Sequence, residues 1–435
     1  MAIINQIKGA ARKLVPASLL GGYHYLWAMG GAIRYGFPSK RIKVVGVTGT
    51  NGKSSTIELL AAILKEAGYK VALSSSIKFE VAGDVRKNGV GNSMPGRFAL
   101  QKLLAQAVAA KCDYAIIEVT SEGIKQFRHK FIDFKGAVFT NLTPEHIESH
   151  GSFENYRNAK LELFKATKGF HVVNRDDENA KYFLGLEAEN KYSYGKCGKS
   201  GGQGAGCIDI CADNIVLSKE GSCFEVEGMN IALNLAGEFN VYNALAAIGV
   251  AAVQGIGVEV CQRALAKVKS IPGRMEKAGS NPEVFVDYAF TPNALEQVYK
   301  TLKGNMATGG KLVCLLGACG GGRDKWKRPV LGQIAAKYCD RIILADEDPY
   351  DEDPQKIIDM VKEGVIKEGF STQNLSEIRD RRQAIGRALT EAGPNDKVVL
   401  TGKGCEAAIR YEKGRRVAWD EKTVVKEELE RLGKG

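Results

Sequence analysis

Residues 46–56, GVTGTNGKSST, decide how the surrounding chain folds. They satisfy the pattern G-x-x-x-x-G-K-[ST], and they lie between an apolar run, KVVGV (43–47), and an amphipathic stretch, IELLAAILKEAG (57–68). A strand, a glycine-rich loop and a helix in this order are typical of phosphate-binding sites, because the glycines let backbone N–H groups turn toward oxyanions. We therefore predict an α/β domain that binds ATP or GTP.

The residues of this loop have individual roles in such a site. The ammonium group of Lys53 reaches the β- and γ-phosphates, and the hydroxyl of Ser54 ligates Mg²⁺. The helix that follows directs its N-terminus at the phosphates and favours their negative charge. The predicted nucleotide-binding residues here are Gly49, Thr50, Asn51, Gly52, Lys53, Ser54 and Ser55.

The composition describes an ordinary globular protein with a basic surface. The chain has 435 residues, of which 44% are hydrophobic and 26% charged, enough for two or three domains and unlike a disordered or fibrous chain. The net charge of +11 suits anionic small ligands, and no nucleic-acid-binding motif accompanies it. Ten cysteines, most of them single in apolar runs, follow no secretion signal, so we expect reduced thiols in a cytoplasmic protein.

Strand and helix patterns alternate along most of the chain. DYAIIEVTS (113–121) and GAVFTNLT (136–143) are apolar strands, and RFALQKLLAQAVAAK (97–111) between the phosphate loop and these strands has a helical pattern. Such alternation predicts βαβ units and a parallel sheet that is buried on both faces. The glycine-rich stretch 191–235 instead predicts antiparallel hairpins appended to that sheet.

Pro272-Gly273 marks a domain boundary, because four further strands, each followed by a helical pattern, come after it. The predicted fold class is α/β: a central phosphate-loop ATPase domain (41–272) with a mostly parallel sheet and small antiparallel hairpins, then a Rossmann-like α/β C-terminal domain (273–435).

Residues 1–40 form an apolar, aromatic segment with basic flanks. The run LVPASLLGGYHYLWAMGGAIRYGF (14–37) is about as long as the roughly 20 residues that span a bilayer, yet it contains Pro16, His24 and several glycines. Three interpretations stay open: a helix packed on the next domain, an interfacial membrane element, or a membrane span.

Two polar residues follow neighbouring apolar strands where a metal site is expected. Glu118 lies at the end of AIIEVTS (115–121), and His146 comes soon after AVFTNLT (137–143). Ligands of parallel α/β sheets bind at the carboxyl ends of the strands. Glu118 and His146 are therefore candidate Mg²⁺ ligands beside Ser54.

Longer motifs resemble the Mur ligases, the ATP-dependent amide-forming enzymes of peptidoglycan synthesis. The resemblance covers about residues 41–425 and follows the MurE type in the C-terminal part. Its motifs are GVTGTNGKSST (46–56), NLTPEHIESHGSFENYRNAKLELF (141–164), GEFNVYNALAAIGVA (237–251), IPGRME (271–276), DYAFTPNAL (287–295), GACGGGRDKWKRPVLG (317–332), EDPYDEDP (347–354) and TGKGCEA (401–407).

The resemblance implies a mechanism with ATP and Mg²⁺. ATP phosphorylates a substrate carboxylate, and an amine then attacks the acyl phosphate, which gives an amide, ADP and phosphate. The resemblance implies catalytic roles for Lys53, Lys160, Arg274 and His146. It implies that Lys160 is carbamylated. The metal ligands that it implies are Ser54, Glu118, His146 and the modified Lys160. It also implies adenine-side contacts from Asn240 and Asn243, a γ-phosphate contact from Arg274, and a ribose-side contact from Asp287.

The same resemblance suggests where the two other substrates bind. The sugar-peptide acceptor would contact Ser93, Met94, Thr120, Gln126 and Arg128, and the incoming amino acid would contact Asp348, Tyr350, Gly402 and Glu406. Arg128 suits a carboxylate because a guanidinium pairs with it through two hydrogen bonds. The expected partners are thus a muropeptide and an amino acid, and we expect a monomer.

Several positions depart from the family pattern. The phosphate loop begins at residue 46, so the usual UDP-binding domain has no counterpart before it, and we expect UDP to be absent from the acceptor or weakly held. Tyr350 stands where diaminopimelate-adding enzymes have an arginine, which disfavours that amino acid, while the acidic run 351–353 would suit a cationic one. Phe290, Cys405 and Glu122 each replace a histidine.

Two alternatives remain. One is a MurT-like amidating subunit that acts on a lipid-linked acceptor; such proteins hold zinc with four cysteines, and Cys197, Cys207, Cys211 and Cys223 are candidates, although their spacing is wide for zinc. The other is a non-catalytic nucleotide-binding scaffold, which the combined set of Lys53, Glu118, His146, Lys160 and Arg274 disfavours.

Overall fold

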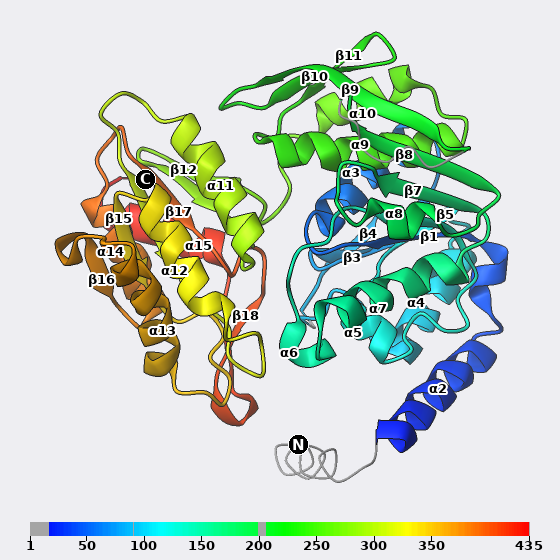
Figure 1. The fold of residues 1–435 in the computed structure, drawn as a ribbon, viewed down its shortest axis with the longest axis horizontal. Coiled ribbons are helices and arrows are strands. Elements are labelled where there is room, and N and C mark those ends of the chain that lie inside the picture. The colour runs from blue at the N-terminus through cyan, green and yellow to red at the C-terminus, as the bar shows by residue number, and fades with distance from the viewer. Residues whose placement is uncertain (1–16, 90, 199–205, 435) are drawn as a thin grey trace.

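The computed structural model describes residues 17–89, 91–198 and 206–434, and Figure 1 shows two bodies of sheet and helix side by side. Part of the N-terminal segment, residues 1–16, lies outside the described residues. The two bodies correspond to the two α/β halves predicted from the strand and helix patterns.

The described part of the first body is built on an eleven-stranded sheet whose centre is parallel. The strand order is β11-β10-β9-β8-β7-β6-β1-β5-β2-β3-β4, so β1 lies between β6 and β5. Parallel pairing runs from β2 to β9, and antiparallel strands extend both edges. The strands are β1 Lys43–Thr48, β2 Val71–Ser74, β3 Lys78–Val81, β4 Asp84–Lys87, β5 Tyr114–Glu118, β6 Phe134–Phe139, β7 Phe170–Asn174, β8 Asn190–Lys196, β9 Ile208–Leu217, β10 Ser222–Val226 and β11 Met229–Leu233.

Helices cover both faces of this sheet, which is why its central strands are apolar throughout. Helices α3, α9 and α10 share one hydrophobic core with the sheet, and α4 and α7 share the other. Alternate residues of β1 show the division, because Val45 and Val47 belong to the first core and Val44 to the second. The helices are α3 Lys53–Glu66, α4 Arg97–Ala109, α5 Ser121–Lys125, α6 Ile147–His150, α7 Phe153–Ala166, α8 Ala180–Leu184, α9 Glu238–Val253 and α10 Val258–Lys267.

The glycine-rich stretch 191–235 differs in part from its prediction. Strands β9, β10 and β11 form the expected antiparallel meander, but β8 pairs in parallel with β7 and with β9. The prediction of hairpins throughout is therefore wrong for β8. The physical reason is burial, since Tyr194 of β8 is 1% exposed and donates its hydroxyl proton to the carbonyl of Phe139 in β6, 3.0 Å away.

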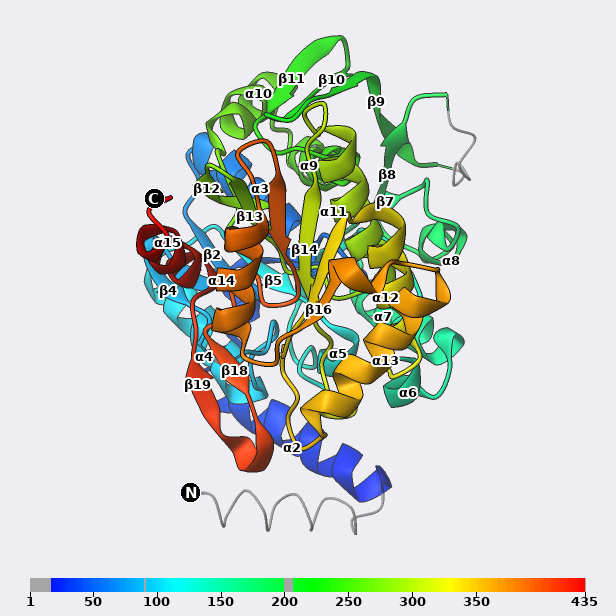
Figure 2. The ribbon, with the colours of Figure 1, turned by 90° about the vertical axis from the view of Figure 1, so that its left-hand side faces the viewer.

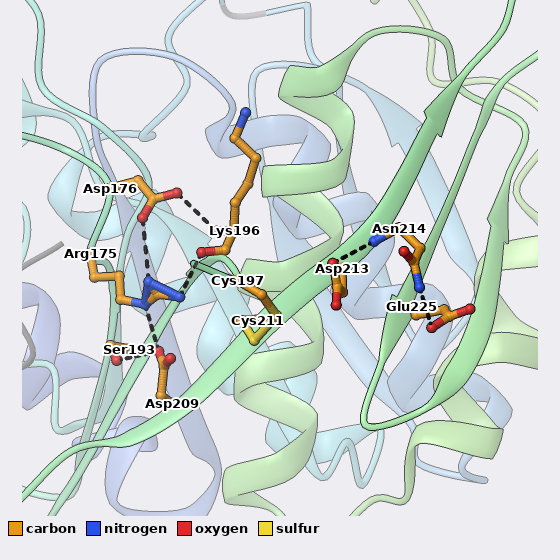
Figure 3. The surroundings of a disulfide bond; sticks show 10 residues. All are labelled: Arg175, Asp176, Ser193, Lys196, Cys197, Asp209, Cys211, Asp213, Asn214 and Glu225. Atoms are coloured by element: carbon orange, nitrogen blue, oxygen red, sulfur yellow. Dashed lines mark hydrogen bonds and ion pairs between the residues drawn. A yellow bond between two sulfur atoms is a disulfide. The ribbon is translucent and has the colours of Figure 1, made fainter. Parts of the chain in front are cut away.

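The parallel register of β8 and β9 brings two cysteines together. Gly195 pairs with Cys211 and Cys197 donates its backbone N–H to Ala212, so the Cys197 and Cys211 sulfurs form a disulfide (Figure 3). A second disulfide joins Cys314 and Cys339. The expectation of reduced thiols is wrong for these four residues. The hypothesis of a four-cysteine zinc site is wrong as well, because two of its candidates are bonded to each other.

The second body has a six-stranded sheet in the order β12-β13-β17-β14-β15-β16, parallel except for the β12–β13 pair. Helices α11, α12 and α13 pack on one face and α14 and α15 on the other. The strands are β12 Glu276–Ser280, β13 Glu283–Val286, β14 Leu312–Leu316, β15 Arg341–Leu344, β16 Leu375–Glu377 and β17 Lys397–Leu400, beside a β18 Ala408–Arg410 and β19 Arg416–Ala418 hairpin. The helices are α11 Pro292–Gly304, α12 Lys327–Tyr338, α13 Pro354–Lys367, α14 Arg381–Glu391 and α15 Glu421–Arg431.

The described part of the N-terminal segment is helix α2, Ala17–Arg34, followed by a short 3-10 helix, η1 Pro38–Arg41. Helix α2 packs against α4 at the periphery of the first body (Figures 1 and 2). Within the described residues, no helix combines the length and hydropathy that a bilayer crossing requires.

A buried arginine fixes the loops at the carboxyl edge of the second sheet. Arg381 and Glu421 are both fully buried and form an ion pair at 2.5 Å. Arg381 also donates to the carbonyl oxygens of Asp346 and Thr401, which follow β15 and β17. Because these loops carry the predicted residues Asp348 and Gly402, Arg381 positions that edge of the cavity described below.

Arg381→Ala should lower the free energy of unfolding by about 3–5 kcal/mol, because it leaves the Glu421 carboxylate buried without its partner. Arg382→Ala is the matched control: the neighbouring guanidinium is 46% exposed and pairs at the surface, so it should cost about 1 kcal/mol or less. Urea unfolding followed by circular dichroism measures both. Equal effects of the two substitutions would contradict this role of Arg381.

Candidate active site

A cavity of about 570 Å³ lies between the two bodies, at the carboxyl ends of their strands. Its wall combines the loop after β1, the ends of β5 and β6, and the loops after β13, β14, β15 and β17. The structure brings all the predicted site residues to this cavity except Asn240.

The phosphate loop depends on two of its glycines. Gly49 and Gly52 have φ angles of 149° and 82°, which favour glycine. A Cβ on Gly49 would lie 1.9 Å from the hydroxyl of Thr140, and one on Gly52 would lie 2.3 Å from Oδ1 of Asn243. The backbone N–H groups of Thr50 and Asn51 are held by Asn141, at 2.8 and 2.9 Å. The loop is therefore close-packed and rigid.

Lys53 and Lys160 converge on this loop. Their ammonium nitrogens lie 3.0 and 2.7 Å from the same acceptor, the carbonyl oxygen of Gly49. Lys160 is 2% exposed and its Nζ lies 4.4 Å from the ring centre of Tyr156. Burial, and then the charge of Lys53, lower the pKa of Lys160 well below its ordinary value. A lysine with a lowered pKa is present as the free amine more readily, which is the form that reacts with CO₂.

Ser54 belongs to a polar cluster at the start of α3. Its hydroxyl donates to Glu118 Oε2 at 2.8 Å, and the same carboxylate oxygen accepts the backbone N–H of Ser76 at 2.9 Å. Arg274 reaches this cluster from the second body, with Nη2 2.9 Å from Oγ of Ser76. The guanidinium carbon of Arg274 lies 4.6 Å from the ring centre of Tyr288.

His146 lines the cavity in its neutral form. Burial, and then the positive charge of Arg323, lower the pKa of His146 to about 2. Its ring lies 5.9 Å from that of Tyr156, whose hydroxyl is 3.1 Å from the Thr50 hydroxyl. A neutral imidazole is the form that can ligate a metal.

A buried ion pair joins the two bodies. Nζ of Lys327 lies 2.6 Å from Oε1 of Glu145, and the two side chains are only 3% and 2% exposed. Close by, the carboxylate of Asp324 accepts the backbone N–H groups of Ile147 and Glu148 at 3.1 and 2.9 Å. The predicted residues of the first body are thus held against loops of the second.

The predicted adenine and ribose contacts come from different bodies, Asn243 from α9 and Asp287 from the end of β13. Asn243 lines the cavity, while Asn240 stands behind and accepts a hydrogen bond from Nδ2 of Asn243 at 3.1 Å. Asp287 accepts the backbone N–H groups of Met275 and Ala289, each at 2.6 Å, and burial raises its pKa to about 6. Asp287 therefore also fixes the chain where the second body begins.

The predicted acceptor residues all line the cavity. Ser93, Met94 and Thr120 line it beside Gln126 and Arg128. Arg128 donates to the carbonyl of Met94 and, at 2.9 Å, to Oε1 of Gln126. The Thr120 hydroxyl accepts the backbone N–H of Gly123 at 3.0 Å.

The predicted amino-acid residues form a charged cluster in the second body. The Asp348 carboxylate lies 2.8 Å from Nζ of Lys403 and 2.6 Å from Nη1 of Arg410. Glu406 accepts Lys403 at 2.5 Å and the Tyr288 hydroxyl at 3.2 Å. Gly402 has a φ of 98°, and a Cβ there would lie 2.4 Å from a Glu347 carboxylate oxygen.

Tyr350 borders the same cluster, but the acidic run after it does not. Tyr350 has a φ of 53° and donates its backbone N–H to Arg410. Asp351 accepts the N–H of Lys413, Glu352 pairs with Arg328, and Asp353 caps α13, so none of the three lines the cavity. The inference of a cationic amino acid from this run therefore loses its support.

The replacements at histidine positions have different surroundings. Phe290 lines the cavity with its ring 5.0 Å from Nζ of Lys327, and Glu122 contacts the hydroxyl of Ser149. Burial raises the pKa of the Cys405 thiol.

Sequence reasoning missed several cavity residues, among them Ser76, Glu145, Arg323, Lys327 and Arg410. Two had usable signals: Ser76 comes two residues after the end of the apolar strand β2, at the ligand-binding edge of the sheet, and Glu145 directly precedes His146. Lys327 had none, because a lysine that begins a helix is usually solvated.

The donor set fits Mg²⁺. A hydroxyl, a carboxylate and a neutral imidazole from Ser54, Glu118 and His146 line the cavity beside the phosphate loop, and Mg²⁺ prefers one or two carboxylates together with phosphate oxygens. Within the described residues, no three His, Cys, Asp or Glu side chains are gathered closely enough to hold a metal by themselves. The fit is therefore to a metal that is shared with bound phosphate.

Comparison with known proteins assigns the family. The model of the Mur ligase middle domain matches residues 47–251, and that of the Mur ligase glutamate ligase domain matches residues 273–404. The chain belongs to the Mur ligase family. This confirms the resemblance inferred from its motifs.

Relatives of this Mur ligase carry MurE-type names. It is 36% identical over 92% of its length to a Clostridium botulinum protein named UDP-N-acetylmuramoyl-L-alanyl-D-glutamate--2,6-diaminopimelate ligase, of which it covers 80%. It is also 36% identical to a Treponema denticola UDP-N-acetylmuramyl-tripeptide synthetase, with 92% and 78% of the two chains covered. A solved structure with the diaminopimelate ligase title is 28% identical, with a TM-score of 0.58 over 90% of this chain and 79% of that one.

Gly52→Ala should weaken binding of Mg²⁺-ATP by at least about tenfold, since the added methyl group collides with Asn243 and strains a left-handed backbone. Gly68→Ala is the control, because Gly68 has a similar φ of 89° and open space around its Cβ position. Isothermal titration calorimetry measures both. Equal affinities for Gly52→Ala and the wild type would contradict the account of the loop.

Proposed function

We propose that this Mur ligase joins the amine of an amino acid to a carboxylate of a muropeptide acceptor at the expense of ATP. The observation that carries the proposal is one continuous cavity lined by the phosphate loop, by Arg128, and by Asp348 and Glu406. In this proposal residues 41–272 hold ATP and acceptor, and residues 273–435 bring the amino acid.

The chemistry requires two anions to meet. The acceptor carboxylate attacks the γ-phosphorus of ATP, the bond to the β,γ-bridging oxygen breaks, and ADP leaves. The amine then attacks the acyl carbon of the acyl phosphate and inorganic phosphate leaves. Lys53 and Arg274 supply positive charge at the transferring phosphoryl group, where charge develops in the transition state.

The proposed metal ligands are Ser54, Glu118, His146 and Lys160. Mg²⁺, when bound, neutralises phosphate charge and orients its oxygens. The buried free amine of Lys160 would contribute after reaction with CO₂, which forms an N–C bond and releases one proton, and so turns a neutral amine into a carbamate anion whose oxygens can ligate the metal. The lowered pKa of Lys160 supports this modification because the free amine is the reactive form.

Nucleotide recognition would use Gly49, Thr50, Asn51, Gly52 and Ser55 at the phosphates, Asn240 and Asn243 toward adenine, and Asp287 toward ribose. Asn240 would act by orienting Asn243, given their hydrogen bond. Arg274 reaches the start of α3 from the second body, so it completes the phosphate site only when the two bodies are closed together.

The acceptor would bind along Ser93, Met94, Thr120, Gln126 and Arg128. We take it to carry the muramoyl-alanyl-glutamate of the relatives' names, with or without UDP. The ammonium of the amino acid would face the Asp348 and Glu406 carboxylates beside Tyr350 and Gly402. In this proposal one chain supplies the whole cavity and works as a monomer, and the need for ATP favours a reaction in the cytoplasm.

The direct test mixes purified protein, ATP, Mg²⁺ and UDP-N-acetylmuramoyl-L-alanyl-D-glutamate with each common amino acid or diaminopimelate, and measures phosphate release. We expect release with one or a few amino acids, and a tripeptide product of matching mass. Because Tyr350 replaces a guanidinium, we expect diaminopimelate to be a poorer substrate than another amino acid. Phosphate release that no amino acid stimulates would contradict the proposal.

Lys160→Ala should lower the rate of product formation about 10²- to 10³-fold, the usual loss when one electrostatic group of the site is removed. Lys160→Glu should retain more activity than Lys160→Ala, because glutamate also places a carboxylate there. Lys165→Ala, on the exposed face of the same helix α7, should behave as wild type. Unchanged turnover in Lys160→Ala would rule out the role given to this lysine.

A further inference from the structure

In helix α2, small residues are buried and several large apolar residues are exposed, which is the reverse of the usual pattern of burial. Ala28 and Ala32 are 1% and 0% exposed, and they pack with Gly31 toward α4. Several large side chains are instead well exposed, among them Leu26 and Ile33, while the half-exposed Trp27 also contacts Phe98 of α4 with its ring edge. In a helix of a soluble domain the large apolar residues form the buried stripe.

The outward side of α2 is apolar and aromatic. Leu26 and Ile33 are each 60% exposed, Tyr23 is 52% and Trp27 is 45%. These residues recur at helical spacing and share one face with Arg34. Large apolar residues that are exposed together on one face are typical of an interaction site, whereas single exposed ones are ordinary surface.

The charged residues around the outward face of α2 are all basic. The chain up to Arg41 contains six Lys and Arg residues, and the first acidic residue of the whole sequence is Glu58. Arg34, Lys40 and Arg41 are exposed at the end of α2 and in η1. Basic residues beside Trp, Tyr and Leu on a helix are typical of attachment to anionic lipid.

The same helix adjoins residues that are predicted to bind the acceptor. The ring of Tyr25 lies 5.1 Å from that of Phe131 and 6.3 Å from that of Phe127. His24 contacts Arg97, whose Nε donates to the carbonyl of Gln126 at 2.8 Å. Helix α2 therefore lies beside the segment that carries Gln126 and Arg128.

We propose that the outward face of α2 docks on the surface of an anionic lipid bilayer. Leu26, Trp27 and Ile33 enter the boundary between headgroups and acyl chains, and Arg34, Lys40 and Arg41 contact lipid phosphates. The helix lies in the plane of the surface, in keeping with its hydropathy, which falls short of that of a membrane-crossing helix. Docking of this kind holds the predicted acceptor-binding residues close to the membrane surface.

The test is sedimentation of the full chain with vesicles of phosphatidylglycerol and phosphatidylcholine, compared with vesicles of phosphatidylcholine alone. Wild-type protein should bind the anionic vesicles, and salt should weaken the binding. The variant L26E/I33E should partition at least about tenfold less well, since two side chains that enter the lipid become charged. L26A/I33A, which keeps good helix formers at both positions, should fall between the two.

V216E/L217E is the matched control. It adds the same two charges at neighbouring apolar residues of β9 that are 63% and 47% exposed, and it should bind vesicles as wild type does. The proposal is overturned if the wild type does not bind anionic vesicles, or if L26E/I33E and L26A/I33A both bind as wild type. Light scattering that shows a wild-type dimer and an L26E/I33E monomer would assign the face to a second copy and also overturn it. The assay needs no substrate, so its outcome is independent of the proposed reaction.

Discussion

The convergence of positive charge on the phosphate loop is the constraint on which the rest of this structure depends. The ammonium groups of Lys53 and Lys160 share one carbonyl oxygen, that of Gly49, and burial opposes the charge of both. Repulsion between two cations at this distance favours loss of the proton from one of them, which gives the free amine that the proposed reaction of Lys160 with CO₂ requires and leaves Lys53 to meet a phosphate anion. The cavity is therefore arranged for phosphate, and the rest of the fold places other groups around that anion.

The two sheets contribute to the cavity in different ways. In the first body, β1, β5 and β6 end at the cavity and place Glu118 and the loop lysine within one rigid frame. In the second body, the loops after β15 and β17 are tied down by Arg381 from behind. The buried Glu145–Lys327 pair joins the two bodies. If the two bodies separated, this ion pair would break, and each charge would need water in place of its partner. Opening of the cavity is therefore coupled to its hydration.

The sequence was most informative where local rules apply. The phosphate loop and strand β1 follow from glycine spacing and from an apolar run, and both lie where the pattern predicted. Contacts between distant segments were not predictable in this way. Lys327 pairs with Glu145 across 182 positions, and neither residue carries a local sign of that partnership. The parallel pairing of β8 was also missed, because its glycine-rich surroundings resemble a hairpin and only its buried tyrosine reveals the central position.

Helix α2 shows that composition alone does not predict how a helix packs. Its apolar composition was evident, but composition does not say which face is covered, and the small residues of the helix proved to be the buried ones. Likewise, the acidic run after Tyr350 suggested a cationic ligand, whereas each carboxylate has a structural partner. A charged residue that is close to a site in the sequence indicates a ligand only when its side chain is known to point into the site.

The central claim is that one cavity holds the γ-phosphate of ATP and the acceptor carboxylate within bonding distance before any amine arrives. Positional isotope exchange tests it most directly, with ATP carrying ¹⁸O in the β,γ-bridge and no amino acid present. The account predicts that the label moves to non-bridging positions of the β-phosphate when UDP-N-acetylmuramoyl-L-alanyl-D-glutamate is added, and not in its absence. Label that stays in the bridge with the acceptor bound, or that moves equally without it, would contradict the account.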